Sequence, residues 1–500
     1  MRLSSHEGGG GWPGGVGGLP PGLFGGGAQS MFGDGSYSGN VIQGGSVLQP
    51  VAEYEFKLSG MSNTSWSTAL GGYEATGLWD GGLYSSACWI GVWPGTEAWA
   101  QADLPGMNRI SRYVLKARND NYYNRHASAW RIEGWDGSAW VVLDTRSGIT
   151  SGQYGWGVDF TGTLTAPSVP VSKVRLVLTA MQAGNDGYFE IGELEVYAKV
   201  QNALVVTGAA TVAPDAVTGA SVVMGDTILL DGASASLKPS TNSKGLLVYT
   251  KTRFQLINGA KLNIDKMGKA GNFGTLTAFD LTPDSLKRKL NRSRLSAYVV
   301  LGEGANGAPA NASVGSGSAG SAAAAMQTGG GGSGVTELPN PPPGGKGGKG
   351  GPCCGGAGGG GHSYQATAFA GIDAGDFGGP GGNASTGGNG ATGGAGDPVG
   401  TGADGGVNGE GAGGGLLMLF TPSFVNNAGC IVSADGARAG ATCPNYYYGG
   451  SAGGGIVCIV TKAGGYSNLG TVRAAGGAGI SGAYSGGPGG AGSVNIFTAA

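Results

Sequence analysis

Short apolar runs separated by turn residues dominate residues 50–198 of the chain. Six such runs are residues 98–104, 112–117, 129–135, 140–144, 173–179 and 189–197. Asp136-Gly137 separates two of them and is typical of a tight hairpin turn. Strands of this length, at this spacing, predict an antiparallel β-sandwich for this part of the chain.

A second pattern of apolar strands repeats along the rest of the chain. Residues 245–250, 415–421 and 455–461 are apolar runs, each followed by a turn with Asn or Gly and a second run. The last two copies start at Leu416 and Ile456, 40 residues apart, whereas 170 residues separate the first copy from the second. We therefore expect one β framework in residues 199–300 and 416–500, with residues 301–415 inserted between its strands.

One helix is expected within the first half of this framework. Residues 281–290 have helical character, with Thr282 as the N-cap and Pro283 at the first helical position. Its basic residues, followed by Arg292 and Arg294, superficially suggest nucleic acid, but a solvated helix face is the favoured interpretation.

The inserted segment from Gly329 to Gly415 is dominated by glycine. The whole chain contains 109 Gly and 22 Pro in 500 residues, a composition that alone favours a flexible linker. Two features favour packing instead: charged residues are only 12% of the chain, and predicted strands hold both ends of the segment close together. Without a Cβ, extended helices of the polyproline II type could pack closely enough to hydrogen-bond to their neighbours. The fold class predicted is therefore mainly β, with glycine helices.

Charge and targeting signals argue against nucleic-acid binding, membrane insertion and export through a signal peptide. A net charge of −2 leaves no electrostatic footprint for nucleic acid, and no apolar run is long enough to insert into a membrane. The N-terminus lacks the apolar core of a signal peptide, so we expect synthesis in a cytoplasm. The six cysteines match no zinc or redox spacing. Buried thiols are favoured over a disulfide from Cys430 or Cys443 to Cys458.

No motif for catalysis or cofactor binding is present. The GGKGGKGG run lacks the order of a phosphate-binding loop, and there is no HExxH and no nucleophile elbow. The segment Gly393-Gly394-Ala395-Gly396-Asp397 matches a calcium-binding glycine repeat only once and out of frame. We expect no catalytic residues, no metal ligands and no cofactor, with structural calcium left open. Paired carboxylates of a glycan depolymerase need no linear motif, so that alternative also stays open.

Four segments of the predicted sandwich resemble the coagulation-factor type C, or discoidin, family. Residues 99–104 (WAQADL) look like its WIQVDLG strand, and residues 130–140 (WRIEGWDGSAW) look like its YKIEYSNDGKTW hairpin. Residues 174–176 and 191–197 (IGELEVY) look like its closing strands, in the same order, across some 150 residues. Departures are a Trp-rich insertion at residues 85–97 and the lack of the family's framing cysteine pair.

The resemblance implies binding of glycans or lipid head groups, without catalysis, through loops at one end of the sandwich. The corresponding loops are residues 79–93 and 119–126. Their aromatic side chains could stack on sugar rings and their polar side chains could bond hydroxyls. The alternative is that some of these aromatics belong to the core. The candidate ligand-binding residues are Trp79, Asp80, Trp89, Trp93, Tyr122, Tyr123, Asn124, Arg125 and His126.

Residues 1–49 form a Gly/Pro-rich leader that carries a second resemblance. Residues 31–41 (MFGDGSYSGNV) resemble the FGDGSDG opening of bacteriophage tail proteins, with Tyr37 and Ser38 replacing Asp and Gly. A β framework with glycine tracts likewise resembles the distal parts of phage tail fibres and adhesins. Together these imply a tail-fibre or tail-tip protein of the virion. We expect it to assemble as a homotrimer, because β frameworks with exposed edges and few charges need partners to cover them. It would join other tail proteins and attach to a bacterial surface glycan or other envelope receptor through the sandwich or the glycine-rich tip. A purely structural virion component is the alternative.

Overall fold

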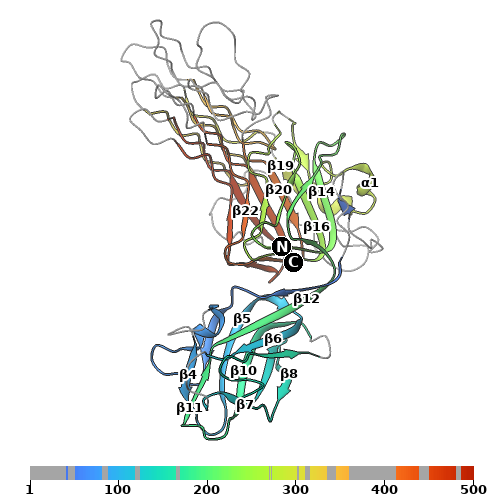
Figure 1. Cartoon of the computed structure of the whole chain (residues 1–500). Helices are drawn as coiled ribbons and strands as arrows, with labels where there is room; N and C mark the ends of the chain where they lie inside the picture. Colours follow the sequence, from blue (N-terminus) through green and yellow to red (C-terminus); the bar gives the residue numbers. More distant parts are fainter. Residues whose placement is uncertain are drawn as a thin grey trace.

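Two bodies joined by one long strand make up the chain (Figure 1). The computed structural model describes residues 41–42, 51–81, 88–118, 124–164, 169–269, 271, 273–300, 303–309, 316–334, 345–359, 413–438, 450–479 and 486–499. Strands dominate both bodies, and the predicted mainly β class is confirmed.

The lower body in Figure 1 is an antiparallel sandwich. One sheet has the order β3-β5-β10-β7-β8, and the other is formed by β2, β12, β6 and β9. A small ladder, β4 with β11, and the 3₁₀ helix η2 complete the body. The bounds are β2 Val51–Lys57, β3 Ser62–Trp66, η2 Ala75–Trp79, β4 Trp89–Val92, β5 Ala98–Asn108, β6 Ile110–Lys116, β7 Ala127–Trp135, β8 Trp140–Arg146, β9 Phe160–Thr163, β10 Val171–Met181, β11 Tyr188–Ile191 and β12 Glu193–Val206.

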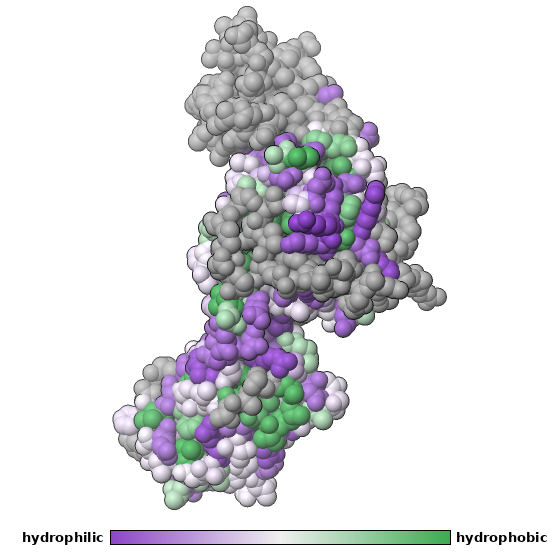
Figure 2. Space-filling view, turned by 90° about the vertical axis from the view of Figure 1, so that its right-hand side faces the viewer, coloured by the Kyte–Doolittle hydropathy of each residue, from purple (hydrophilic) through white to green (hydrophobic). Residues whose placement is uncertain are grey.

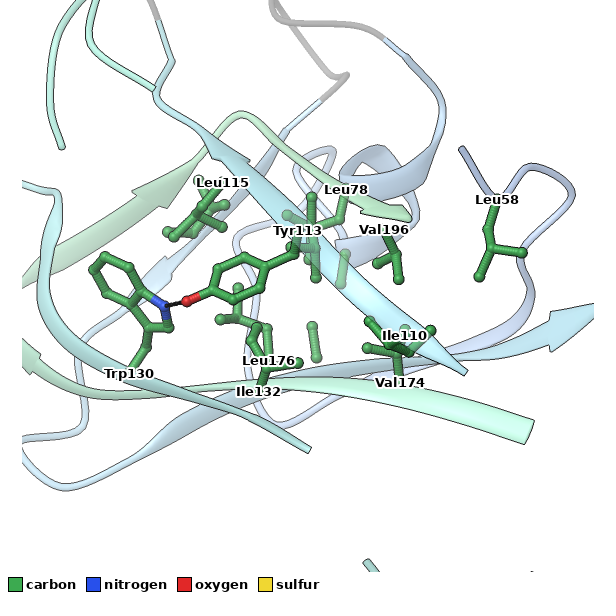
Figure 3. Close-up of a cluster of buried hydrophobic side chains, with 14 of the residues drawn as sticks. Leu58, Leu78, Ile110, Tyr113, Leu115, Trp130, Ile132, Val174, Leu176 and Val196 are labelled. Carbon is green, nitrogen blue, oxygen red and sulfur yellow. Dashed lines mark hydrogen bonds between the residues drawn. The ribbon is translucent and has the colours of Figure 1, made fainter. Parts of the chain in front are cut away.

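The sandwich core contains a polar relay between its sheets, and Figure 3 shows its first bond, from Trp130 to Tyr113. Trp130 Nε1 donates to the Tyr113 hydroxyl at 3.0 Å, and this hydroxyl donates to Asp144 Oδ2 at 2.7 Å. Burial and the bond to Asp144 raise the pKa of Tyr113, so it stays a neutral donor. All six predicted strands are present, although the run 189–197 is split into two strands at Gly192.

The upper body stacks strands in parallel. β14, β16, β20 and β23 pair in parallel in one sheet, and β13, β15, β17, β22 and β25 do so in a second. Leu246 pairs with Leu417, and Leu416 with Ile456, so the repeat read from the sequence is confirmed as consecutive layers. The bounds are β13 Ala209–Val212, β14 Ser221–Asp231, β15 Ser236–Pro239, β16 Leu246–Ile257, β17 Lys261–Asn263, β20 Leu416–Phe420, β21 Ser423–Asn426, β22 Ile431–Ser433, β23 Ile456–Lys462, β24 Tyr466–Asn468, β25 Thr471–Arg473 and β26 Ser493–Ala499.

The glycine segments continue this stacking without strands. The N–H groups of residues 329–334 return to the same neighbouring segment at every third residue. Gly329 and Gly332 donate to Gly454 and Ser451, Gly330 and Ser333 to Ser321 and Ser318, and Gly331 and Gly334 to Gly348 and Gly345. Their carbonyls accept, in the same rhythm, from three further segments within residues 305–308, 356–359 and 487–490. A period of three without internal bonds is that of a polyproline II helix, here enclosed by six neighbours.

For the described glycines, packing replaces the linker interpretation. A Cβ on Gly331 would lie 1.8 Å from the Ala357 carbonyl oxygen, and one on Gly330 would lie 1.9 Å from that of Asn306. Only glycine fits such distances. Residues 360–412, including the calcium-like segment 393–397, lie outside the described part of the chain.

The predicted helix at 281–290 is wrong in length and in its cap. Two short helices form instead, α1 (Asp284–Lys287) and α2 (Arg292–Leu295). Pro283, not Thr282, is the N-cap residue, and the buried Thr282 hydroxyl donates to Ala278 O at 2.8 Å. The Thr282 side chain, which was expected to cap the helix, is therefore buried in the core. Figure 2 shows a strongly hydrophilic patch on the upper body, on the side where Figure 1 places α1. Arg288 and Arg292, which follow and begin the two helices, are exposed. The short strands β1 (Val41–Ile42), β18 (Leu276–Thr277) and β19 (Val299–Val300) complete the elements.

The described cysteines are buried. Cys88, Cys353, Cys354, Cys430 and Cys458 all lie inside the protein, and no disulfide joins any two of them. A disulfide between Cys430 and Cys458 is therefore not formed, and Cys443 lies outside the described residues.

A shared core fixes the sandwich to the upper body. β12 pairs with β2 and β6 in the sandwich and then runs parallel to β14 in the upper body. Leu229 and Ile257 of the upper body belong to the sandwich core. Arg253 Nη1 also donates to Asn108 Oδ1 at 3.1 Å across the joint. The upper body therefore determines the direction in which the sandwich points.

Candidate functional site

The loops that carry some of the predicted binding residues lie at the end of the sandwich remote from the upper body. β5 ends at Asn108, beside Arg253 of the upper body, and begins at Ala98, about 35 Å away at the spacing of a strand. Four segments meet around the Ala98 end: residues 93–97, 124–126, 147–159 and 182–188. We refer to them as the distal loops.

Reciprocal hydrogen bonds interlock the distal loops. Asn124 Nδ2 donates to Gly184 O at 2.6 Å, and Asn185 Nδ2 donates back to Asn124 O at 2.9 Å. The Asn185 Oδ1 atom accepts the Gly187 N–H at 2.8 Å, which forms a tight turn around Gly187, whose φ is +91°. The Gly187 carbonyl in turn accepts the Trp93 N–H at 2.8 Å. These bonds hold the loops in one arrangement before any ligand arrives.

Arg125 is the centre of charge in this cluster. Its Nε and Nη2 atoms donate to Asp186 Oδ2 at 2.9 and 2.8 Å, and its guanidinium lies 5.0 Å from the centroid of the Tyr188 ring. The hydrogen bonds from Arg125 lower the pKa of Asp186. Glu190 is fully buried between Arg118, 3.3 Å away, and Arg125, 4.0 Å away. The result is a planar, internally neutralised group of donors and acceptors beside an aromatic ring.

Two predicted binding residues are core residues, and their assignment is corrected here. Trp89 is fully buried, donates from Nε1 to Thr68 O at 2.8 Å, and packs edge-on against Phe189. His126 is also fully buried, with its ring 5.5 Å from that of Tyr154. Neither side chain has surface left to touch a ligand. Packing against Phe189 places Trp89 inside, and packing against Tyr154 places His126 inside.

The other predicted residues divide into three groups. Trp93, Asn124 and Arg125 lie together in the distal loops, where Trp93 is half-buried. Trp79 closes η2 and is half-buried against the sandwich core, whereas Asp80, which follows it, is exposed. Tyr122 and Tyr123 lie outside the described residues.

The structure adds residues that the motif comparison did not single out. Asn185 and Asp186 come from the loop before β11, and Tyr188 is the first residue of that strand. Trp156 comes from the loop between β8 and β9. Trp156 is 45% exposed, an unusual state for so large an apolar side chain. Gln182 Nε2 donates to Tyr154 O at 2.8 Å and ties the Trp156 loop to the other distal loops. The Asn-Asp-Gly turn between two predicted strands was a usable signal, but only the fold shows which loop it meets.

The described residues offer no cluster of three or more His, Cys, Asp or Glu side chains that could hold a metal ion. Within the same part of the chain, no helix has the length and apolar character needed to cross a membrane.

Among known proteins, the chain is similar to solved structures but not to any protein-family model or curated sequence. No protein-family model matches the chain, and no curated protein is significantly similar to it in sequence. Among solved structures, a family 32 carbohydrate-binding module of NanJ from Clostridium perfringens, in complex with galactose, is 18% identical (TM-score 0.24). The alignment covers 29% of this chain and 99% of that module.

Two further solved structures are similar over 29% and 27% of the chain. The chitosan-binding module 1 of a chitosanase/glucanase from Paenibacillus sp. IK-5 is 22% identical, with 29% of this chain and 99% of that module covered and a TM-score of 0.23. The lectin domain of Lectinolysin, complexed with Lewis B antigen, is 18% identical, with 27% and 91% covered and a TM-score of 0.23. Similarity at this level carries no conclusion about what this chain binds.

Proposed function

We propose that the chain is a non-catalytic glycan-binding protein whose distal loops hold the carbohydrate. The observation that carries the proposal is the interlocked group of Arg125, Asp186 and Tyr188 at the end of the sandwich remote from the upper body. A planar guanidinium and carboxylate present donors and acceptors to sugar hydroxyls, and a neighbouring aromatic ring can stack on the apolar face of a sugar. The exposed Trp156 adds a second aromatic surface.

The same geometry argues against hydrolysis by the two carboxyl groups that lie next to Arg125. A glycosidase needs two accessible carboxyl groups facing the scissile bond, one of which must be able to donate a proton. Asp186 is held ionised by Arg125, and Glu190 is fully buried between two arginines. Neither group is available as a general acid, which supports binding over cleavage.

We further propose that this binding serves attachment of a bacteriophage to a bacterial surface glycan, with the chain as a homotrimeric tail-fibre or tail-tip protein in the virion. The leader segment 31–41 and the glycine-rich framework support this assignment through their resemblance to tail proteins. A purely structural virion component is the second candidate.

The test is a glycan array of bacterial surface polysaccharides probed with the full chain. We expect saturable binding that Trp156→Ala weakens about tenfold, the loss of roughly one stacking contact, and that Arg125→Ala weakens further. Val217→Ala is the matched control, because Val217 is 85% exposed on the upper body. Equal binding by the wild type, Trp156→Ala and Arg125→Ala would reject the distal loops as the site.

A further inference from the structure

The outer face of the sheet β3-β5-β10-β7-β8 carries three tryptophans that the distal loops do not use. Alternate residues of these strands point into the sandwich core, so the residues between them point outward. The pairing register arranges the outward residues of β5, β10, β7 and β8 in three rows. These rows are Trp99, Val177, Arg131 and Thr145; Gln101, Arg175, Glu133 and Val142; and Asp103, Lys173, Trp135 and Trp140.

The tryptophans occupy opposite corners of this grid. Trp135 and Trp140 form a cross-strand pair with ring centroids 5.7 Å apart, and the Arg175 guanidinium lies 4.2 Å from the centroid of the Trp140 ring. Trp99 lies three strands and two rows away from Trp140, about 20 Å at standard sheet spacings. All three are half-buried, so each keeps part of its ring at the surface. The span is much longer than one sugar ring.

The charges between these corners cancel within the face. Glu133, with a side chain only 6% exposed, bonds to both Arg131 and Arg175. Arg131 also pairs with Glu97, and Lys173 pairs with Asp103 at 2.8 Å. Three cations thus face three carboxylates, and the Gln101 amide lies among them. A neutral ligand can use the remaining donors and acceptors, whereas a polyanion would have to break existing ion pairs.

The opposite outer face of the sandwich shows that tryptophan is not needed to cover such a sheet. There, Lys57 and Lys116 bond to Glu193 and Glu195 across β2, β12 and β6. None of these three strands contains a tryptophan. The tryptophans of the other face therefore require a separate explanation.

We propose that this Trp-bearing face is a second carbohydrate-binding surface, which takes an extended, uncharged polysaccharide. Trp99 and the Trp135–Trp140 pair contact sugar rings at the two ends of the diagonal, and Gln101 and Arg175 donate hydrogen bonds to hydroxyls between them. The distal loops bind the end or branch of a glycan, whereas the face binds along a chain. The proposal does not depend on the distal loops being a binding site.

Affinity electrophoresis of the full chain through gels containing hydroxyethylcellulose or galactomannan, with alginate as the anionic comparison, tests the proposal. All proteins carry Trp156→Ala, so that any contribution of the distal loops is reduced. We expect retardation in at least one neutral gel, at least a fivefold loss of affinity with Trp99→Ala or Trp140→Ala, and a smaller loss with Gln101→Ala. Trp140→Phe retains most of the retardation, and Val217→Ala changes nothing.

Three results would overturn the proposal: no retardation by either neutral polymer, retardation by alginate alone, or unchanged retardation in the Trp99 and Trp140 variants. Gln101→Ala removes only a surface amide and keeps the test decisive if a tryptophan variant fails to fold. Sedimentation of the same proteins identifies the competing explanation, because a dimer lost in Trp140→Ala would make this face a contact between copies of the chain. These outcomes are separate from those of the glycan array, where Arg125→Ala reports on the distal loops.

Discussion

Gly331→Ala is the sharpest test of how the glycine-rich segment is ordered. Gly331 lies in the central segment 329–334, which six neighbouring segments enclose. Its N–H donates to Gly348 O at 2.9 Å, and its carbonyl accepts the Ala308 N–H at 2.8 Å. An added methyl group would lie 1.8 Å from the Ala357 carbonyl oxygen. Since that oxygen belongs to the backbone, no side-chain rotation can relieve the clash.

The size of the effect follows from this overlap. A normal contact of about 3.4 Å requires segments 329–334 and 356–359 to separate by about 1.6 Å. This separation breaks or weakens the two hydrogen bonds between them, from Gly356 N–H to Gly329 O at 2.8 Å and from Gly359 N–H to Gly332 O at 2.9 Å. Two such bonds contribute roughly 1 to 3 kcal/mol together, and overpacking costs about 1 to 3 kcal/mol more. We therefore expect a loss of roughly 2 to 6 kcal/mol, or about 10 °C in the unfolding midpoint of a body of this size.

Differential scanning calorimetry and limited proteolysis of the full chain measure this loss. Gly208→Ala is the matched control, because its Cβ meets nothing within 4 Å and its backbone does not have a positive φ. We expect its free energy of unfolding to stay within about 0.5 kcal/mol of the wild type. If Gly331→Ala and Gly208→Ala unfold at the same temperature and are cut at the same rate, the glycine segment is a linker and the packing argument fails.

Three further predictions concern the sandwich and its joint. Burial opposes ionisation of Glu195, but hydrogen bonds from two lysines and a tyrosine lower its pKa to about 2. The ionised carboxylate therefore stabilises the fold above pH 4.5, and about 1 to 2 kcal/mol of the free energy of unfolding is lost as the pH falls from 4.5 to 2. Urea unfolding at each pH measures this loss. Tyr113→Phe removes the hydroxyl bonded to Trp130 and should cost roughly 1 to 3 kcal/mol, measured by the same assay, with no loss refuting the relay. Gly106→Val places a Cβ 2.8 Å from Arg253 Nη2, at a φ of +75°, and should loosen the joint between the sandwich and the upper body. We expect a larger radius of gyration in small-angle scattering, and an unchanged radius would contradict this prediction.

The fold was largely predictable because the pattern of apolar and turn residues within each short stretch identifies its strands. Alternating runs and the Asp136-Gly137 turn predict β7 and β8, and apolar runs 40 residues apart predict the pairing of Leu416 with Ile456. The prediction of one helix at 281–290 was wrong because the side chain of the expected capping residue, Thr282, is hydrogen-bonded to Ala278 O instead. Local propensity gives no information about such a contact.

The candidate site was less predictable, because loop contacts depend on the whole sandwich. The family resemblance placed Trp93 and Arg125 in loops that meet at one end of the sandwich, yet it could not distinguish them from Trp89, which is fully buried. It also missed Asp186, which is 61 residues from Arg125 in sequence but bonded to it in space. A loop residue's partner is set by which strand ends meet, and this is a property of topology rather than of spacing.

The joint between the two bodies and the packed glycine segments, which we call the glycine lattice, suggest why the proposed binding loops are carried by so large an upper body. β12 passes without a break from the sandwich sheet into the parallel sheet of the upper body, and Leu229 and Ile257 complete the sandwich core. In the lattice, hydrogen bonds run between segments far apart in sequence, so bending one segment strains several others. Stiffness on both sides of the joint keeps the distal loops pointing in one direction. When several copies face the same surface, such fixed presentation raises the effective concentration of each second site and turns weak single contacts into strong attachment.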